Sequence, residues 1–221
     1  MNNKHILFCV EGRTEGARTI YGKGIKNILR VEVEYMRKKK IFHDVKVFNG
    51  KHEMMREIDF HVSQHLYPAK YKPDTKLEDC YVFILRDLDC ENIKEIEDEI
   101  NNKLSGYKNY YSIHFAKQEI EAWIVADINC FKSVYRTNAI CLVKAIENIP
   151  YIVEPEKVDC DPKISERIEQ IARKCSNRYR KTIEGPQLLK FADPDVVSKK
   201  CPSFLSFRND LRKQIGFLDP I

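Results

Sequence analysis

Acidic side chains follow three apolar stretches of this sequence, each at the point where the apolar residues end. The acids are Glu11 after residues 6–10, Asp87 and Asp89 after residues 81–85, and Glu119 and Glu121 after residues 110–115. If these stretches are parallel strands, their carboxyl ends meet at one edge of a sheet, where open α/β sheets bind ligands. We therefore expect the acids to lie close together.

A group of carboxylates at one point predicts a bound cation, because the like charges repel strongly at low dielectric unless a cation neutralises them. Oxygen ligands suit hard cations, so the expected ion is Mg²⁺ or Mn²⁺. Such an ion accepts substrate phosphates, activates water and stabilises a leaving oxygen. The predicted chemistry is therefore that of phosphoryl groups.

Each acid also has a purely structural explanation. Glu11 alone could lie in a solvated turn, and Glu15 could be a first-turn charge that the helix dipole favours. Glu119 and Glu121 cannot share a face if both lie in one helix, so which of them is a ligand stays open. The coincidence of acids after three apolar stretches favours the metal site.

The elements that must position these acids alternate along residues 1–128. Apolar runs predict strands at residues 6–10, 45–48, 81–85 and 110–115, and spacing typical of helices covers residues 14–38, 53–66, 93–104 and 120–126. This alternation predicts an α/β fold, a Rossmann-like sheet of about four mainly parallel strands with helices on both faces.

Residues 129–221 have a different pattern, with helical spacing and frequent prolines. Candidate helices cover residues 141–147, 164–174, 187–191 and 204–215. We expect this part to be a C-terminal helical extension packed on the α/β domain of residues 1–128. Trp123, the single tryptophan, is expected to anchor the core between the two parts.

The composition is that of a globular protein, with 221 residues, 43% hydrophobic residues and a net charge of +5. The amino terminus lacks the apolar length of a signal peptide, and no stretch approaches the ~20 apolar residues that span a bilayer. The 8 cysteines include no Cys-x-x-Cys pair. We therefore expect a cytoplasmic protein, with free thiols and no membrane partner.

The opening segment Val-Glu-Gly-Arg-Thr-Glu at residues 10–15 and Leu-Arg-Asp-Leu-Asp at residues 85–89 resemble the TOPRIM pattern. Two further segments make the chain similar to the OLD-like branch of TOPRIM proteins and to the DUF4276 proteins. They are Gln-Glu-Ile-Glu-Ala-Trp at residues 118–123 and Tyr-Arg-Lys-Thr-Ile-Glu-Gly-Pro at residues 179–186. The resemblance extends from residue 6 to about residue 211.

The resemblance implies a TOPRIM-like sheet and a magnesium-dependent nuclease site. It implies metal ligands at Glu11, Glu15, Asp87, Asp89 and either Glu119 or Glu121, with Glu11 or Glu15 as a general base. It also implies that Lys181 steadies the phosphate. Proteins of this kind serve as effectors of prokaryotic anti-phage defence beside an ATPase, which must be a separate chain because no phosphate-binding Gly-x-x-x-x-Gly-Lys segment occurs here.

Several alternatives stay open. Arg178, Arg180 and Lys181, with Tyr179 among them, could bind DNA or a tRNA or other RNA, or could be an ordinary surface helix. The chain could be a non-catalytic or ATPase-gated subunit of a defence complex, a homodimer, or a phosphatase or receiver-like domain. His61 and His65 have the spacing of zinc ligands, but no third ligand is evident, so a solvated helix face is favoured.

Overall fold

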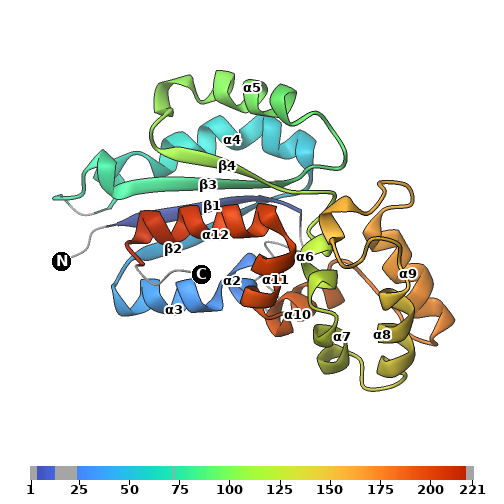
Figure 1. Ribbon diagram of the computed structural model, residues 1–221. Helices are drawn as coiled ribbons and strands as arrows, with labels where there is room; N and C mark the ends of the chain where they lie inside the picture. The colour runs from blue at the N-terminus through green and yellow to red at the C-terminus, as the bar shows by residue number, and fades with distance from the viewer. Residues whose placement is uncertain (1–3, 13–23, 72, 218–221) are drawn as a thin grey trace.

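A four-stranded parallel sheet lies at the centre of the computed structural model, which describes residues 4–12, 24–71 and 73–217 (Figure 1). The strands are β1 (His5–Glu11), β2 (Phe42–Phe48), β3 (Cys80–Asp87) and β4 (Tyr111–Ala116), in the order β2-β1-β3-β4. All four predicted strands are present and each neighbouring pair is parallel, which confirms the predicted α/β fold.

Both faces of the sheet are buried. Successive side chains of a strand point to opposite faces, so each strand contributes residues to both. In β1, Phe8 and Val10 belong to one core cluster, whereas Leu7 and Cys9 belong to a second. A strand that is covered on both faces needs apolar residues at every position. This requirement explains the continuous apolar runs in the sequence.

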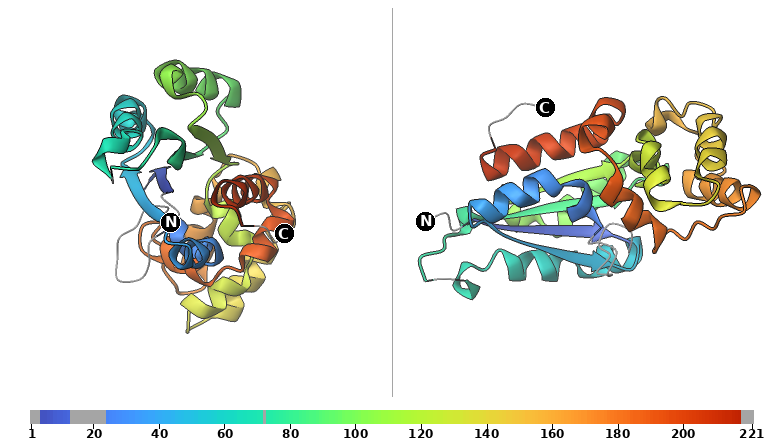
Figure 2. Two further views of the ribbon diagram at one scale, coloured as in Figure 1. Left: turned by 90° about the vertical axis from the view of Figure 1, so that its left-hand side faces the viewer. Right: turned by 90° about the horizontal axis from the view of Figure 1, so that it is seen from below.

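Helices cover the two faces as right-handed crossovers require. On one face lie α4 (Lys51–His65) and α5 (Ile93–Lys103); on the other lie α2 (Ile25–Ile28), α3 (Arg30–Lys38) and α12 (Pro202–Ile215) (Figures 1 and 2). The helix predicted at residues 14–38 is interrupted in its described part, since Leu29 separates α2 from α3. Its first residues, together with Glu15, lie outside the described residues.

The helical part lies beyond the carboxyl ends of the strands (Figure 1). Its helices are α6 (Glu121–Ala126), α7 (Asn129–Val134), α8 (Ala139–Glu147), α9 (Ile164–Lys174), α10 (Glu184–Phe191) and α11 (Pro194–Lys200). Single 3₁₀ turns occur at Pro68–Lys70, Leu77–Asp79, Ser105–Tyr107 and Pro155–Lys157. The sequence analysis did not predict α7 and α11.

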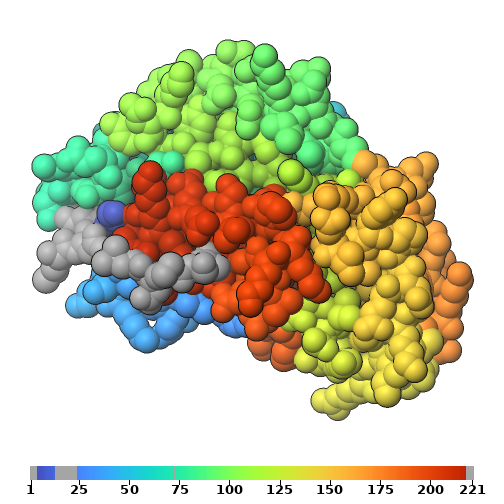
Figure 3. Space-filling view, viewed as in Figure 1, coloured from blue at the N-terminus to red at the C-terminus, as the bar shows by residue number. Residues whose placement is uncertain are grey.

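Helix α12 returns from the helical part to the sheet, where it packs against β4 and α3, and it lies at the centre of the face shown in Figure 3. Its Phe207 packs against Phe8 and Phe83 of the sheet. Trp123 is fully buried, contacts Phe204 and Phe207, and donates a 3.0 Å hydrogen bond to the Ser203 hydroxyl, so its predicted role as an anchor is confirmed. One core thus crosses residue 128, and a domain boundary there stays a prediction.

A buried ionic cluster ties α12 to α3. Arg208 Nε lies 2.8 Å and Arg212 Nε lies 2.6 Å from Oε1 of Glu32, which has no exposed surface. Arg208 also donates to Asp195 of α11, at 2.6 Å. Since a buried carboxylate is tolerated only when it is paired, this cluster fixes the position of α12.

Two disulfides join segments that are distant in sequence, namely Cys90–Cys160 and Cys141–Cys175. The prediction of free thiols is therefore wrong for these residues and right for Cys9, Cys80, Cys130 and Cys201, which are free and buried. The pairings depend on tertiary proximity, which cysteine spacing does not reveal. None of the helices in the described ranges has the length and apolar character needed to cross a membrane.

Candidate metal centre

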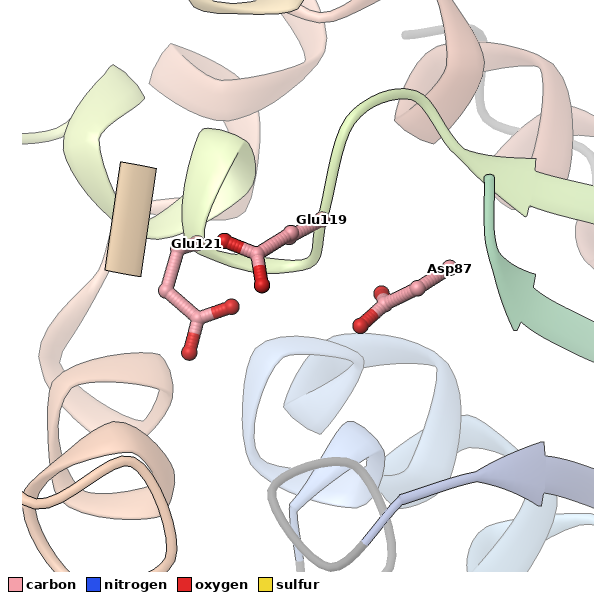
Figure 4. Close-up of side chains that lie close together, drawn as sticks. All are labelled: Asp87, Glu119 and Glu121. Atoms are coloured by element: carbon pink, nitrogen blue, oxygen red, sulfur yellow. The ribbon is translucent and has the colours of Figure 1, made fainter. Parts of the chain in front are cut away.

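Three of the predicted acids come together at the carboxyl edge of the sheet. One carboxylate oxygen from each of Asp87, Glu119 and Glu121 lies within 4.8 Å of the others. Figure 4 shows the three side chains directed toward one shared space: Asp87 from the end of β3, Glu119 from the turn after β4, and Glu121 from the start of α6. We call these residues the acidic centre.

The turn after β4 brings both glutamates to the same point. Gln118 adopts a positive φ of 68°, and Glu119 precedes the helix, whose first residue is Glu121. The Ile120 amide donates a 2.8 Å hydrogen bond to Oδ1 of Asp87, which ties this turn to β3. Because only one glutamate is helical, the rule against a shared helix face does not apply, and both acids belong to the centre.

Hydrogen bonds from the helical part hold the glutamates. Glu119 accepts from the backbone amide and the hydroxyl of Ser165, both at 3.0 Å. Glu121 accepts a 2.8 Å hydrogen bond from the Tyr179 hydroxyl. Glu119 is 4% exposed and Glu121 is 0% exposed, so water competes little for these bonds.

Lys181 is the cation of the acidic centre. Its ammonium nitrogen lies 3.3 Å from Asp87, 3.2 Å from Glu119 and 3.0 Å from Glu121. Three carboxylates and one ammonium leave the group with an excess of negative charge when all are ionised. A divalent cation would balance that excess better than one lysine does.

Burial raises the pKa of Asp87 and the pKa of Glu121 above their ordinary values. For Asp87, the ammonium of Lys181 opposes this rise, while Glu121, Glu119 and Glu11 add to it. For Glu121, Lys181 again opposes the effect of burial. Burial therefore disfavours the ionised form of both carboxyls, and the Lys181 ammonium offsets this only in part.

The acidic centre fits a hard divalent ion. Its donors are all carboxylate oxygens, the ligands that Mg²⁺ and Mn²⁺ prefer. Oε2 of Glu121 is buried and has no well-aligned hydrogen bond in the described part of the chain, although the Lys181 ammonium is close to it. A buried carboxylate oxygen of this kind is available as a ligand.

Glu11 and Asp89 lie beside the acidic centre but have other partners. Oε2 of Glu11 is 3.1 Å from Nε of Arg86, a residue that also pairs with Glu91. Asp89 forms a 2.6 Å ion pair with Lys163. Burial raises the pKa of Glu11, the Arg86 guanidinium lowers it, and the charge of Asp89 raises it further. Glu11 and Asp89 are therefore close enough to interact electrostatically.

Arg178 and Arg180 are exposed, and Lys181 points into the acidic centre. The guanidinium of Arg180 pairs with Glu184, with Nη2 to Oε1 at 2.5 Å. The carbonyl of Arg178 accepts a 3.1 Å hydrogen bond from the Tyr135 hydroxyl. The expected basic patch is thus divided between a surface pair and an inward lysine.

The histidine pair of α4 differs from the solvated face that the sequence predicted. His65 is buried, with Nε2 3.2 Å from the His5 carbonyl oxygen and Nδ1 2.7 Å from the Tyr71 hydroxyl. His61 lies next to Glu57 on the helix surface, at 3.8 Å. His65 is therefore a core residue whose ring nitrogens are both partnered.

Sequence reasoning missed the residues that hold the acids. Ser165 and Lys163 come from the start of α9, and Arg86 from the end of β3. Tyr179 stood in the segment that carries the family resemblance, which was the one available signal for it. The roles of Ser165, Lys163 and Tyr179 depend on how the helical part meets the sheet, and that of Arg86 depends on the pairing of β3 with β1; local patterns carry no information about either.

The fold and the acidic centre define a class of α/β proteins with a carboxylate site at the carboxyl edge of a parallel sheet. Within it, the chain belongs to the DUF4276 family, described as a domain of unknown function, whose family model matches residues 10–212. No curated protein matches the chain, and neither does any solved structure.

Proposed function

We propose that this protein is a divalent-metal-dependent phosphodiesterase, a TOPRIM-type nuclease that cleaves DNA or RNA with Mg²⁺ or Mn²⁺. One observation carries the proposal: three carboxylates from two segments, the end of β3 and the turn that leads into α6, converge around the Lys181 ammonium at the carboxyl edge of the sheet. Ligands of open α/β sheets bind at that edge.

The residues divide the work as follows. Asp87, Glu119 and Glu121 would hold the ion, which when bound would supply a Lewis acid and lower the pKa of a water molecule. Lys181 provides positive charge for a phosphate at the same point. Glu11, whose pKa is raised mainly by burial, is the candidate proton acceptor at the end of β1.

The exposed side chains of Arg178 and Arg180 precede Lys181 in the sequence and would contact the nucleic-acid backbone. The resemblance to OLD-like proteins supports a role as the effector of an anti-phage system in which a separate chain supplies the ATPase. Asp89 and Glu15 are the further ligands that this resemblance implies.

An ATPase-gated subunit is the second candidate, and the position of Lys181 favours it. Because the lysine contacts all three acids, an incoming ion must compete with it. A partner that shifts residues 179–183 would change this competition and so control the site.

The test combines metal binding with cleavage. Mn²⁺ binding is measured by electron paramagnetic resonance, and cleavage is measured on labelled single- and double-stranded DNA and RNA. We expect the parent to bind Mn²⁺ and cleave, and Asp87→Asn and Glu121→Gln to lose both. Glu166→Gln, which changes an exposed acid of α9, is the matched control and should behave as the parent.

The outcomes separate the candidates. Metal binding without cleavage, with cleavage appearing only when an ATPase partner is added, supports the gated subunit. Parental binding and cleavage in both Asp87→Asn and Glu121→Gln would show that the acidic centre is not the site.

A further inference from the structure

We infer that Ser165 and Tyr179 are positioning residues that set the metal affinity of the acidic centre from the helical part of the chain. The inference rests on the proposed metal site and adds to that site the hydrogen-bond donors that orient two of its ligands. Neither residue is expected to touch the metal or the substrate. Each acts through the glutamate to which it donates.

Ser165 fixes Glu119 at both oxygens. Its backbone amide donates to Oε2 and its hydroxyl donates to Oε1, each at 3.0 Å. Two donors from one residue define the plane of the carboxylate, which a single hydrogen bond does not. Ser165 lies in the first turn of α9, an 11-residue helix, where the helix dipole also favours a negative group.

Tyr179 fixes Glu121 at one oxygen and leaves the other for the ion. Its hydroxyl donates to Oε1 at 2.8 Å, and the tyrosine is only 4% exposed. Oε2 of the same glutamate faces the Lys181 ammonium at 3.0 Å. Because hydrogen bonds to a charged acceptor are strong in a buried setting, the tyrosine selects which oxygen faces the centre.

The two donors come from parts of the chain that lie well beyond the acids in sequence. The hydroxyl of Ser165 meets Glu119 across 46 positions, and that of Tyr179 meets Glu121 across 58 positions. Packing of the helical part therefore sets the orientation of both glutamates before any ion arrives. Groups that orient metal ligands in this way typically change metal affinity by about 10- to 100-fold when they are removed.

The experiment measures Mn²⁺ affinity of the full chain by electron paramagnetic resonance, with no need for activity. We expect Ser165→Ala and Tyr179→Phe each to weaken binding by about 10-fold or more. Ser165→Thr keeps the hydroxyl and should bind within about twofold of the parent. Parental affinity in Ser165→Thr would show that the loss in Ser165→Ala comes from the missing hydroxyl, and not from a general disturbance of α9.

Two controls remove comparable hydrogen bonds elsewhere. Tyr135→Phe removes a hydroxyl that donates to the Arg178 carbonyl, next to Tyr179, without touching an acid. Ser63→Ala removes the Ser63 hydroxyl on α4, which donates to Phe60. Both should bind Mn²⁺ as the parent does, and thermal melts of all variants check that each one folds.

The failures of the two proposals are distinct. If Asp87→Asn abolishes Mn²⁺ binding while Ser165→Ala and Tyr179→Phe bind as the parent does, the metal site stands and the positioning roles are wrong. If Tyr135→Phe weakens binding as much as Tyr179→Phe, the effect is structural and the inference is also wrong. A parent chain that binds no Mn²⁺ overturns both proposals.

Discussion

The ammonium of Lys181 lies 3.0 Å from Oε2 of Glu121, a carboxylate with no exposed surface. A buried carboxylate needs a cation, and here the chain supplies one of its own. The lysine side chain is 35% exposed, so it can move into solvent, whereas the side chain of Glu121 is fully buried and cannot. The same lysine is thus a stabilising partner and a competitor for any metal.

Lys181→Met should therefore separate these two effects. Without the competing ammonium, we expect Mn²⁺ to bind about 10-fold more tightly, which corresponds to ~1.4 kcal/mol. The metal-free variant should melt at a lower temperature than the parent, because three acids lose their shared cation. Addition of Mn²⁺ should restore the melting temperature.

The measurements are Mn²⁺ titration and thermal denaturation with and without the ion. Lys174→Met changes an exposed lysine of α9 and is the control. Weaker Mn²⁺ binding in Lys181→Met than in the parent would show that the lysine assists the metal and does not compete with it.

Arg208→Met should destabilise the protein by about 3 kcal/mol, because Glu32 would then lie buried with one guanidinium in place of two. Urea unfolding measures this loss in the free energy of unfolding. Arg37→Ala removes a surface pair with Glu34 at 4.0 Å and should cost about 0.5 kcal/mol or less. Equal losses in the two variants would contradict the structural role given to the buried cluster.

The stability of the protein should fall as the pH drops from about 6.5 to about 4, in part because of His65. Burial lowers the pKa of His65 from 6.5 to about 4. Between these pH values, His65 binds a proton in the unfolded chain but stays neutral in the folded chain. The stability that is present above pH 6.5 is therefore lost as the pH falls. The largest contribution of one such group is about 3 kcal/mol.

His65→Gln should flatten the dependence of the unfolding free energy on pH between these limits. His52→Gln, an exposed histidine on the same helix, should leave the pH dependence as it is in the parent. An unchanged slope in His65→Gln would mean that His65 is protonated in the folded protein.

Half of the 8 cysteines should not react with a thiol reagent in the unreduced protein, because they form disulfides. In denaturant without a reductant, we expect 4 reactive thiols, those of Cys9, Cys80, Cys130 and Cys201. Reduction should raise the count to 8. A thiol assay measures both numbers, and 8 thiols before reduction would show that neither disulfide forms.

Loss of a disulfide should also lower stability. The loops that they close span 70 and 34 positions, for which chain entropy gives about 4 kcal/mol each as an upper value. Cys90→Ser and Cys141→Ser should therefore unfold at lower urea concentration than the parent. Identical unfolding curves before and after reduction would contradict this expectation.

Strands and acids were predictable because they are local features. The continuous apolar residues of β1 and β3 follow from burial on both faces, and parallel strands bring Asp87 close to the turn that carries Glu119 and Glu121. The partners of Glu11 and Asp89 were not predictable. Arg86 and Lys163 reach them through the tertiary arrangement, and a sequence pattern records charges without recording which of them meet.

The interruption at Leu29 and the burial of His65 show the same limit. Residues 25–38 have one helical period throughout, yet the backbone of Leu29, with φ −90° and ψ 24°, departs from helical angles. His65 fits an exposed zinc-like pair by spacing, but the His5 carbonyl and Tyr71 enclose it. For His65, contacts from other segments outweigh the local pattern.

The return of α12 to the sheet has a consequence for synthesis of the protein. Phe8 and Phe83 are made early, whereas Phe207, which covers them, is made near the end of the described chain. While translation proceeds, this face of the sheet lacks one of its helices and exposes apolar surface to other nascent chains. This face of the sheet is therefore covered only after α12 has been made, and holdase chaperones that bind exposed apolar segments would act on the chain before residue 202 emerges.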